Sequence, residues 1–171
     1  MKNNNLILLE SKMQLKTKIL FVSMAMAAGL MTGCSSVDLN PNAQEDVAMM
    51  GDPATNPDHP LNHQSIYFAF DSYSVSADSQ DKMQAHARYL TSHPNAKVVL
   101  EGNTDERGGR EYNLALGQKR SESVKDRLQL LGVPADRMES VSFGKEKPRA
   151  LGHDEAAYQE NRRVDIKYLP Q

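Results

Sequence analysis

The chain of 171 residues contains no tryptophan and a single cysteine, Cys34. One cysteine cannot form a disulfide within the chain, so the fold cannot depend on an internal disulfide framework. An excess of positive charge is also missing, because 20 Lys and Arg stand against 22 Asp and Glu, a formal net charge of −2. Nucleic-acid-binding domains usually present a basic face, so the composition gives no reason to expect a nucleic-acid partner.

The apolar segment near the N-terminus, residues 19–31, is shorter than the roughly 20 residues that span a bilayer. It follows Lys16 and Lys18 and ends in small residues, which is the organisation of a secretory signal rather than of a permanent transmembrane helix. Glu10 is unfavourable in the basic region of such a signal. We therefore predict that translation starts at Met13, where a compact basic segment begins.

The lone cysteine ends the sequence Met-Thr-Gly-Cys, which resembles the bacterial lipobox L-x-[GA]-C with Met31 in the place of Leu. The resemblance implies that residues 1–33 are a cleaved signal peptide and that Cys34 carries acyl chains such as palmitate, which anchor firmly when several are present. Ser35, rather than Asp, after the cysteine implies export to the outer membrane. Because residues 1–33 carry four Lys and one Glu, a net +3, the remaining chain carries −5 against −2 for the whole.

Residues 34–62 are predicted to be the lipidated cysteine and a flexible tether. Prolines are scattered there among Asn, Asp, Ser and Gly, and the apolar residues follow no helical or strand period. Such a composition cannot bury enough surface to offset the entropy of ordering the chain. His59 and His63 have the i, i+4 spacing of a helical metal pair, but Pro60 between them argues against a helix.

Residues 63–171 are predicted to form the folded domain, with helical and strand patterns alternating along the chain. Strands are expected at residues 65–70, 97–102, 138–144 and 163–169, and helices from a cap within 76–79 to 90, over 111–131, and as a short helix or turn over 155–163. The order β-α-β-α-β-(α)-β predicts an α+β domain, a four-stranded mixed sheet with helices packed on one face.

The second predicted helix has two faces of interest. Six small or apolar positions recur at steps of three and four and predict a core stripe: Leu114, Gly117, Ser121, Val124, Leu128 and Leu131. Gly117 and Ser121 are small, which favours a close approach of this helix to the sheet. Asn113, Leu116 and Arg120 lie on a neighbouring face, on the flank of the helix.

The loop before this helix is unusually rich in charge: Asp105, Glu106, Arg107, Arg110 and Glu111. Asp105 and the guanidinium of Arg120, close to a helix N-terminus with its partial positive charge, suit a zwitterion that offers an ammonium and a carboxylate. In the alternative interpretation, Asp105 and Arg120 pair with each other and the other charges are a solvated rim. A phosphate loop is disfavoured because the segment lacks a GxGxxG pattern and is acidic. Hydrolase signatures such as HExxH are absent from the sequence.

The segment GNTDERGGREYNLALGQKRSESV resembles the motif G-x-x-D-x-x-G-x-x-x-x-N-x-x-L-x-x-x-R-A-x-x-V of the OmpA-like, peptidoglycan-associating domain family. Every fixed position matches except the Ala, which is Ser121 here, and the ending NRRVDIKY is also similar. The resemblance implies a noncovalent binding module and not an enzyme, with no cofactor. The residues that it assigns to the diaminopimelate of the peptidoglycan stem peptide are Asp105, Arg120, Asn113, Leu116, Phe70, Asp71 and Arg107. Arg162 and Arg163 match the family ending, and two alternatives stay open for them: one of the two braces Asp105 or Asp71, or it contacts the ligand.

The same resemblance implies partners and a location. The lipid-anchored members of this kind are expected to lie in the outer membrane, to face the periplasm and to bind the cell wall. They are also expected to bind the propeller protein TolB and other proteins of the Tol system, which draws the outer membrane inward at cell division. An interaction protein without wall binding is the remaining alternative.

Overall fold

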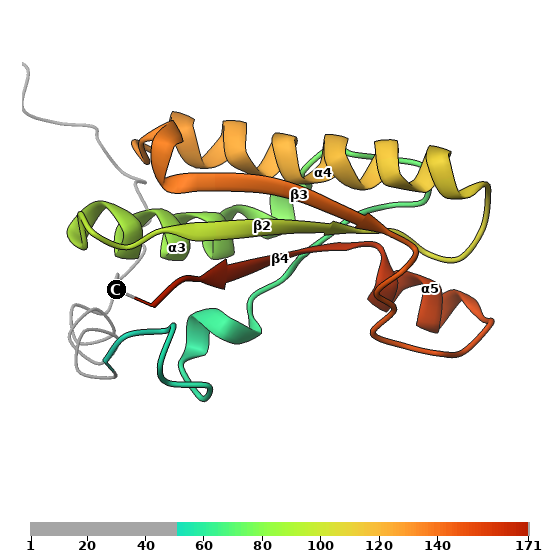
Figure 1. Ribbon diagram of the computed structural model, residues 1–171, viewed down its shortest axis with the longest axis horizontal. Coiled ribbons are helices and arrows are strands. Elements are labelled where there is room, and N and C mark those ends of the chain that lie inside the picture. Colours follow the sequence, from blue (N-terminus) through green and yellow to red (C-terminus); the bar gives the residue numbers. More distant parts are fainter. Residues whose placement is uncertain (1–50, 171) are drawn as a thin grey trace, which may run out of the picture. The chain divides into compact units, whose positions relative to one another are not determined.

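The computed structural model describes residues 51–170, which form one α+β domain (Figure 1). Its elements in chain order are η1 (Pro60–His63), β1 (Ile66–Tyr67), η2 (Ala77–Ser79), α3 (Gln80–Ser92), β2 (Val98–Asn103), α4 (Arg110–Leu130), η3 (Ala135–Arg137), β3 (Met138–Gly144), α5 (Glu155–Asn161) and β4 (Arg163–Tyr168). No helix in this part of the chain is long and apolar enough to cross a membrane. The predicted signal peptide and Cys34 lie outside the described residues.

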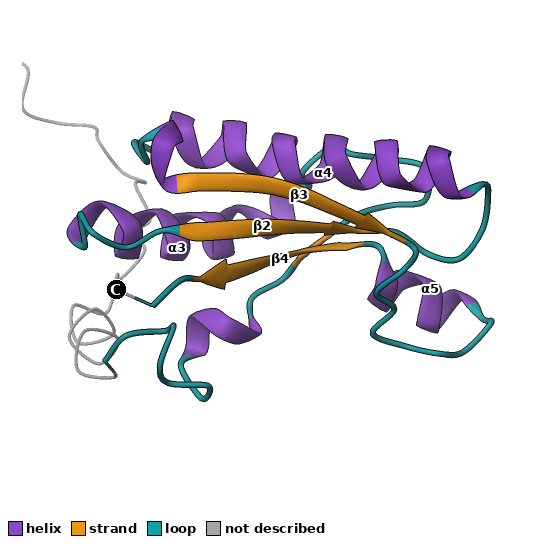
Figure 2. Ribbon diagram, in the orientation of Figure 1, coloured by secondary structure: helices purple, strands orange, loops and turns teal. Residues whose placement is uncertain are grey.

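The four strands form one mixed sheet in the order β1-β4-β2-β3 (Figure 2). β2 and β3 are parallel and are joined by the long helix α4, whereas β4 is antiparallel to both of its neighbours, β1 and β2. This is the predicted fold class. It brings the end of β2, the start of α4 and the start of β4 together at one end of the sheet, where the charged loop lies.

The hydrophobic core lies between one face of the sheet and helices α3 and α4. Alternate residues of β2 and β4, such as Leu100 and Ile166, face each other across the register and are buried. Helix α3 contributes Met83 and Leu90, and α4 contributes Val124 and Leu128 of the predicted stripe, all fully buried. The stripe is buried less completely at its two ends, because Leu114 and Leu131 keep intermediate exposure.

The first strand is shorter than predicted. The aromatic and β-branched pattern over residues 65–70 predicts a strand of that length, but only Ile66–Tyr67 pairs with β4 as a ladder. After Phe68 the chain leaves the sheet, because the carbonyls of Ala69 and Ser72 accept hydrogen bonds from Arg120 instead. Asp71, between them, has a positive φ of 54°.

The predicted tether is too long at its C-terminal end. Leu61 is 3% exposed and belongs to the hydrophobic core, and His59 is buried with its ring edge against Tyr89. The amide of Asn62 donates to the carbonyls of Pro53 and Asn56 and so ties the segment into a compact turn. Individual side chains hold this segment against the domain, so no periodic pattern in the sequence indicates that it is folded. The rest of the predicted tether, residues 34–50, lies outside the described residues.

His86 makes the stability of the domain dependent on pH. The imidazole is fully buried in α3, where Nε2 donates to the Gln64 carbonyl and Nδ1 accepts from the Tyr168 hydroxyl. Burial lowers its pKa from 6.5 to about 4, and the nearby His59 and Lys82 act in the same direction. The folded state binds this proton less well than the unfolded state does. The contribution of neutral His86 to stability is therefore fully present above pH 6.5 and is lost as the pH falls toward 4.

We expect the free energy of unfolding to fall by about 2 kcal/mol between pH 7 and pH 4.5 through this residue alone. The measurement is urea unfolding at a series of pH values, for the unchanged chain and for His86→Gln, which does not titrate. The difference in stability between the two should shrink on acidification. A His63→Gln control removes an exposed histidine that forms no ion pair within residues 51–170 and should leave the pH profile in place. A profile that is identical in His86→Gln contradicts the assignment.

Candidate functional site: a charged pocket at the end of the sheet

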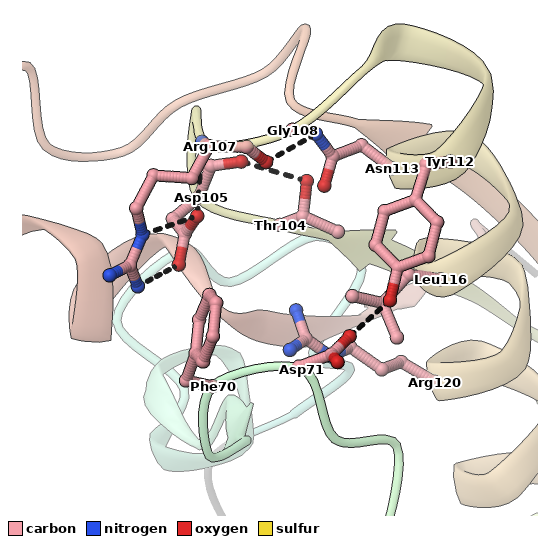
Figure 3. A pocket seen from close by; sticks show the side chains of 10 residues that line it. All are labelled: Phe70, Asp71, Thr104, Asp105, Arg107, Gly108, Tyr112, Asn113, Leu116 and Arg120. Carbon is pink, nitrogen blue, oxygen red and sulfur yellow. Dashed lines mark hydrogen bonds and ion pairs between the residues drawn. The ribbon is translucent and has the colours of Figure 1, made fainter.

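A cavity of about 200 Å³ opens where the loop after β2, the start of α4 and the turn after β1 meet. Figure 3 shows the residues that line it, which are Phe70, Asp71, Thr104, Asp105, Arg107, Gly108, Tyr112, Asn113, Leu116 and Arg120. All seven residues that the family resemblance assigns to the ligand are among them.

The Asp105 carboxylate forms ion pairs with Arg107 and Arg162, and not with Arg120. Its carboxylate accepts from the Arg107 guanidinium at 2.7 and 3.2 Å and from the Arg107 amide at 3.1 Å. Arg162, which is 3% exposed, adds an ion pair at 3.3 Å. Burial of Asp105 acts to raise its pKa, but the hydrogen bonds from Arg107 and Arg162 outweigh it and hold the pKa below the usual range. The alternative of a simple Asp105–Arg120 pair is therefore wrong.

Arg162 and Arg163 have separate tasks, which the sequence alone leaves undecided. Arg162 braces Asp105 and also contacts Glu155 of α5 at 2.6 Å. Arg163 pairs with Asp165 on β4, at 3.0 Å. Only the first of the two arginines is therefore connected to the pocket.

Arg107 contacts several neighbouring segments through its guanidinium. The group lies 4.2 Å from the ring centroid of Phe70 and 4.4 Å from that of Tyr158, and so makes a cation–π contact with each ring. Its bonds to Asp105 fix it to the loop, and Glu155 lies 3.7 Å away. Arg107 is thus part of the scaffold of the site, and Tyr158 is a contributor that the sequence analysis missed.

Arg120 is fully buried, although helical periodicity places it on the flank of α4. Its Nε donates to the Ser72 carbonyl at 2.8 Å, Nη1 to the Asn103 carbonyl at 2.9 Å and Nη2 to the Ala69 carbonyl at 3.1 Å. Desolvation lowers its pKa from 12.5 to about 10, against the opposing influence of Asp105, so the guanidinium remains charged at neutral pH. Arg120 thereby holds the turn after β1 against the end of β2.

The exposed carboxylate of the pocket is that of Asp71, which accepts a hydrogen bond from the Tyr112 hydroxyl. This bond, and to a lesser extent desolvation, raises the pKa of Tyr112. Tyr112 is on the first turn of α4 and Asp71 is on the opposite wall, so the bond crosses the pocket, as Figure 3 shows. The sequence analysis did not select Tyr112; its only sequence signal is an aromatic residue directly before the motif residue Asn113.

Asn113 and Leu116 are buried at the base of the pocket. The Asn113 amide donates to the Arg107 carbonyl at 2.8 Å and so fixes the loop that carries Asp105. Gly108 has a positive φ of 90° in that loop, which favours glycine there. Thr104 and Gly108 complete the lining without having been predicted. No group of three His, Cys, Asp or Glu in residues 51–170 is arranged to hold a metal ion.

The chain is similar to known proteins over most of its length. The model of the OmpA family matches residues 67–162. A peptidoglycan-associated lipoprotein of Pasteurella multocida is 42% identical over 152 residues, which cover 89% of this chain and 97% of that protein. A peptidoglycan-associated lipoprotein of Haemophilus influenzae is 51% identical over 106 residues, covering 62% of this chain and 69% of that protein.

Solved structures agree with the sequence relatives. The crystal structure of the peptidoglycan-associated lipoprotein from Burkholderia pseudomallei is 58% identical, with a TM-score of 0.65, and covers 69% of this chain and 100% of that one. The C-terminal domain of Helicobacter pylori MotB, 20% identical with a TM-score of 0.58 over 63% of this chain and 84% of that one, shares the fold. The names of the lipoprotein relatives describe wall-associated proteins and not an enzyme, as the sequence predicts. The chain therefore belongs to the OmpA family, within its group of peptidoglycan-associated lipoproteins.

Proposed function

We propose that this protein is an outer-membrane lipoprotein that binds the diaminopimelate stem peptide of peptidoglycan noncovalently and so ties the outer membrane to the cell wall. One observation carries the proposal. The pocket combines a buried cation, Arg120, with an exposed carboxylate, Asp71, in a cavity of about 200 Å³. Diaminopimelate offers the complementary ammonium and carboxylate at one end of its side chain.

The contacts within the pocket divide the two charges of such a ligand. Asp105 is already bonded to Arg107 and Arg162, so Asp71 is the more available partner for an ammonium. A guanidinium has five N–H donors, and Arg120 uses three of them on carbonyls, which leaves two for a carboxylate. In this assignment Asp105, Arg107 and Asn113 shape the pocket and line it.

The central test is a titration of the purified full chain in detergent with stem tripeptides that carry either meso-diaminopimelate or lysine. Lysine keeps the ammonium but lacks the side-chain carboxylate, so we expect it to bind about ten- to a hundredfold more weakly, the value of one charge-assisted contact. Isothermal titration calorimetry measures both affinities. Equal affinities would contradict a role for Arg120 in carboxylate binding, and no binding of either peptide would leave protein partners as the explanation for the pocket.

The anchor is proposed from the lipobox at Cys34 and from the names of the relatives, which are lipoproteins. Labelling of growing cells with radioactive palmitate tests it: the unchanged chain should take up label and Cys34→Ser should not. Label in the Cys34→Ser variant would place the lipid elsewhere.

We further propose that TolB and other Tol proteins are partners and that TolB binds at the rim of the same pocket. The exposed rings of Phe70 and Tyr112 at that rim, 60% and 54% exposed, offer an apolar surface to a protein. Wall fragments and TolB would then compete. Capture of TolB by a chain saturated with diaminopimelate tripeptide, at undiminished yield, would contradict a shared site.

A further inference from the structure

We propose that Asp71, held in place by Tyr112, is a specificity-determining gate over Arg120, which rejects a carboxylate that is not accompanied by an ammonium. The inference rests on the proposed function, because it concerns the same pocket and the same ligand. It adds a task to Asp71 beyond pairing with the ligand. It also gives Tyr112, which makes no contribution to the hydrophobic core, a role in selecting the ligand.

Arg120 lines the pocket yet has no exposed surface. The turn that covers it is bonded to it on both sides of Asp71, through the carbonyls of Ala69 and Ser72. Asp71 has a φ of 54°, a conformation that an L-residue other than glycine seldom adopts. The turn therefore holds Asp71 in an unusual backbone conformation, between the two residues whose carbonyls bind the guanidinium.

A hydrogen bond from Tyr112 fixes the Asp71 side chain in this arrangement. Tyr112 lies on the first turn of α4, the same helix that carries Arg120 two turns later, and its hydroxyl donates to the Asp71 carboxylate. Figure 3 shows the bonded pair with the Arg120 side chain in the same pocket, and Asp71 overlaps Arg120 in that view. A ligand carboxylate that binds the two remaining N–H groups of Arg120 therefore enters a pocket that the Asp71 carboxylate also lines.

The charge of Asp71 determines which ligands can approach Arg120. A ligand carboxylate that approaches Arg120 alone is brought close to the carboxylate of Asp71, and two like charges in a partly desolvated site repel. An ammonium on the same ligand pairs with Asp71, cancels its charge and draws it away from Tyr112. A zwitterionic ligand end therefore displaces Asp71 and reaches Arg120, whereas a ligand that carries only the carboxylate is repelled.

Three stem tripeptides that differ only in the third residue separate these effects: meso-diaminopimelate has both charges, 2-aminopimelate has only the side-chain carboxylate, and lysine has only the ammonium. For Asp71→Asn in the full chain, we expect affinity to fall about tenfold for the diaminopimelate peptide and to rise about fivefold for the aminopimelate peptide. Asparagine tolerates a positive φ, so the turn is preserved. A purely structural role for Asp71 would lower both affinities together.

Tyr112→Phe keeps the ring and removes the hydroxyl that holds Asp71. We expect the aminopimelate peptide to bind this variant about threefold to fivefold more tightly, the value of one lost hydrogen bond. The matched control is Tyr73→Phe, an exposed tyrosine on the same turn region that lies outside the pocket lining, with affinities expected within twofold of the unchanged chain. Competition of the two peptides for the same fluorescent tripeptide gives all the values.

Each outcome decides between the claims. Effects of opposite sign in Asp71→Asn, with tighter aminopimelate binding in Tyr112→Phe, are the expected result. Parallel losses for both peptides, or an unchanged aminopimelate affinity in Tyr112→Phe, would overturn the gate while the proposed function stands. No binding of the diaminopimelate peptide to the unchanged chain would overturn the proposed function, and the gate with it.

Discussion

Gly102→Ala is expected to destabilise the domain by about 3 kcal/mol or more, the upper end of the cost of overpacking. A Cβ at this position would lie 1.9 Å from the carbonyl oxygen of Gly117 and 2.6 Å from its carbonyl carbon. Both are backbone atoms of α4, so no side-chain rotation relieves the clash. The helix must move off β2, and Leu116 and Arg120, which line the pocket, move with it.

The matched control for this change is Gly109→Ala. Gly109 caps the same helix with a φ of −71°, and a Cβ there meets nothing within 4 Å, so the change in stability should stay within about 0.5–1 kcal/mol. Urea unfolding followed by circular dichroism gives both values. If the two variants unfold at the same urea concentration, the close approach of α4 to the sheet does not limit stability.

This close approach is the part of the fold that the sequence predicts best. Small residues at Gly117 and Ser121 within an otherwise apolar stripe indicate a helix that nearly touches the sheet, and Gly117 does so at Gly102. The third strand, Met138–Gly144, has its predicted bounds, and α4 differs from its prediction by one residue at each end. Periodicity is reliable for α4 because the predicted stripe is buried over the middle of the helix, from Gly117 to Leu128.

The internal contacts of the pocket are harder to predict. Spacing puts Asp105 and Arg120 near each other, but it does not reveal that Arg107, two residues away, folds back onto Asp105 and leaves Arg120 to backbone carbonyls. Backbone acceptors have no sequence signature, because every residue carries a carbonyl. A helical wheel likewise gives the direction of Arg120 but not the turn that covers it.

Contacts made by single residues also explain why the C-terminal part of the predicted tether, residues 51–62, is folded. A segment with scattered prolines and no apolar period predicts disorder, yet Leu61 and His59 enter the core as individual side chains. Burial of one leucine stabilises by about 1.5–3 kcal/mol and so favours the docked position of this segment. The side-chain amide of Asn62 donates hydrogen bonds to the carbonyls of Pro53 and Asn56 and so pairs polar groups within the segment.

Arg120→Ala is expected to reduce stability by about 3–5 kcal/mol, before any ligand is considered. The change leaves the carbonyls of Ala69, Ser72 and Asn103 without the donors that now satisfy them and frees the turn after β1. Arg110→Ala is the matched control, because Arg110 begins the same helix but forms only an exposed ion pair with Glu146, worth about 0–1 kcal/mol. Urea unfolding of both variants measures the difference.

The structural role of Arg120 also affects how a loss of ligand affinity in Arg120→Ala is interpreted. If Arg120→Ala loses both stability and affinity, the lost affinity cannot be assigned to a missing carboxylate contact, because the turn that carries Phe70 and Asp71 is released at the same time. Hydrogen exchange separates the two: we expect the amide of Ser72, which donates to the Ala69 carbonyl, to exchange faster in Arg120→Ala and normally in Asp71→Asn. Unchanged exchange at Ser72 in Arg120→Ala, together with unchanged stability, would show that Arg120 is needed only for the ligand.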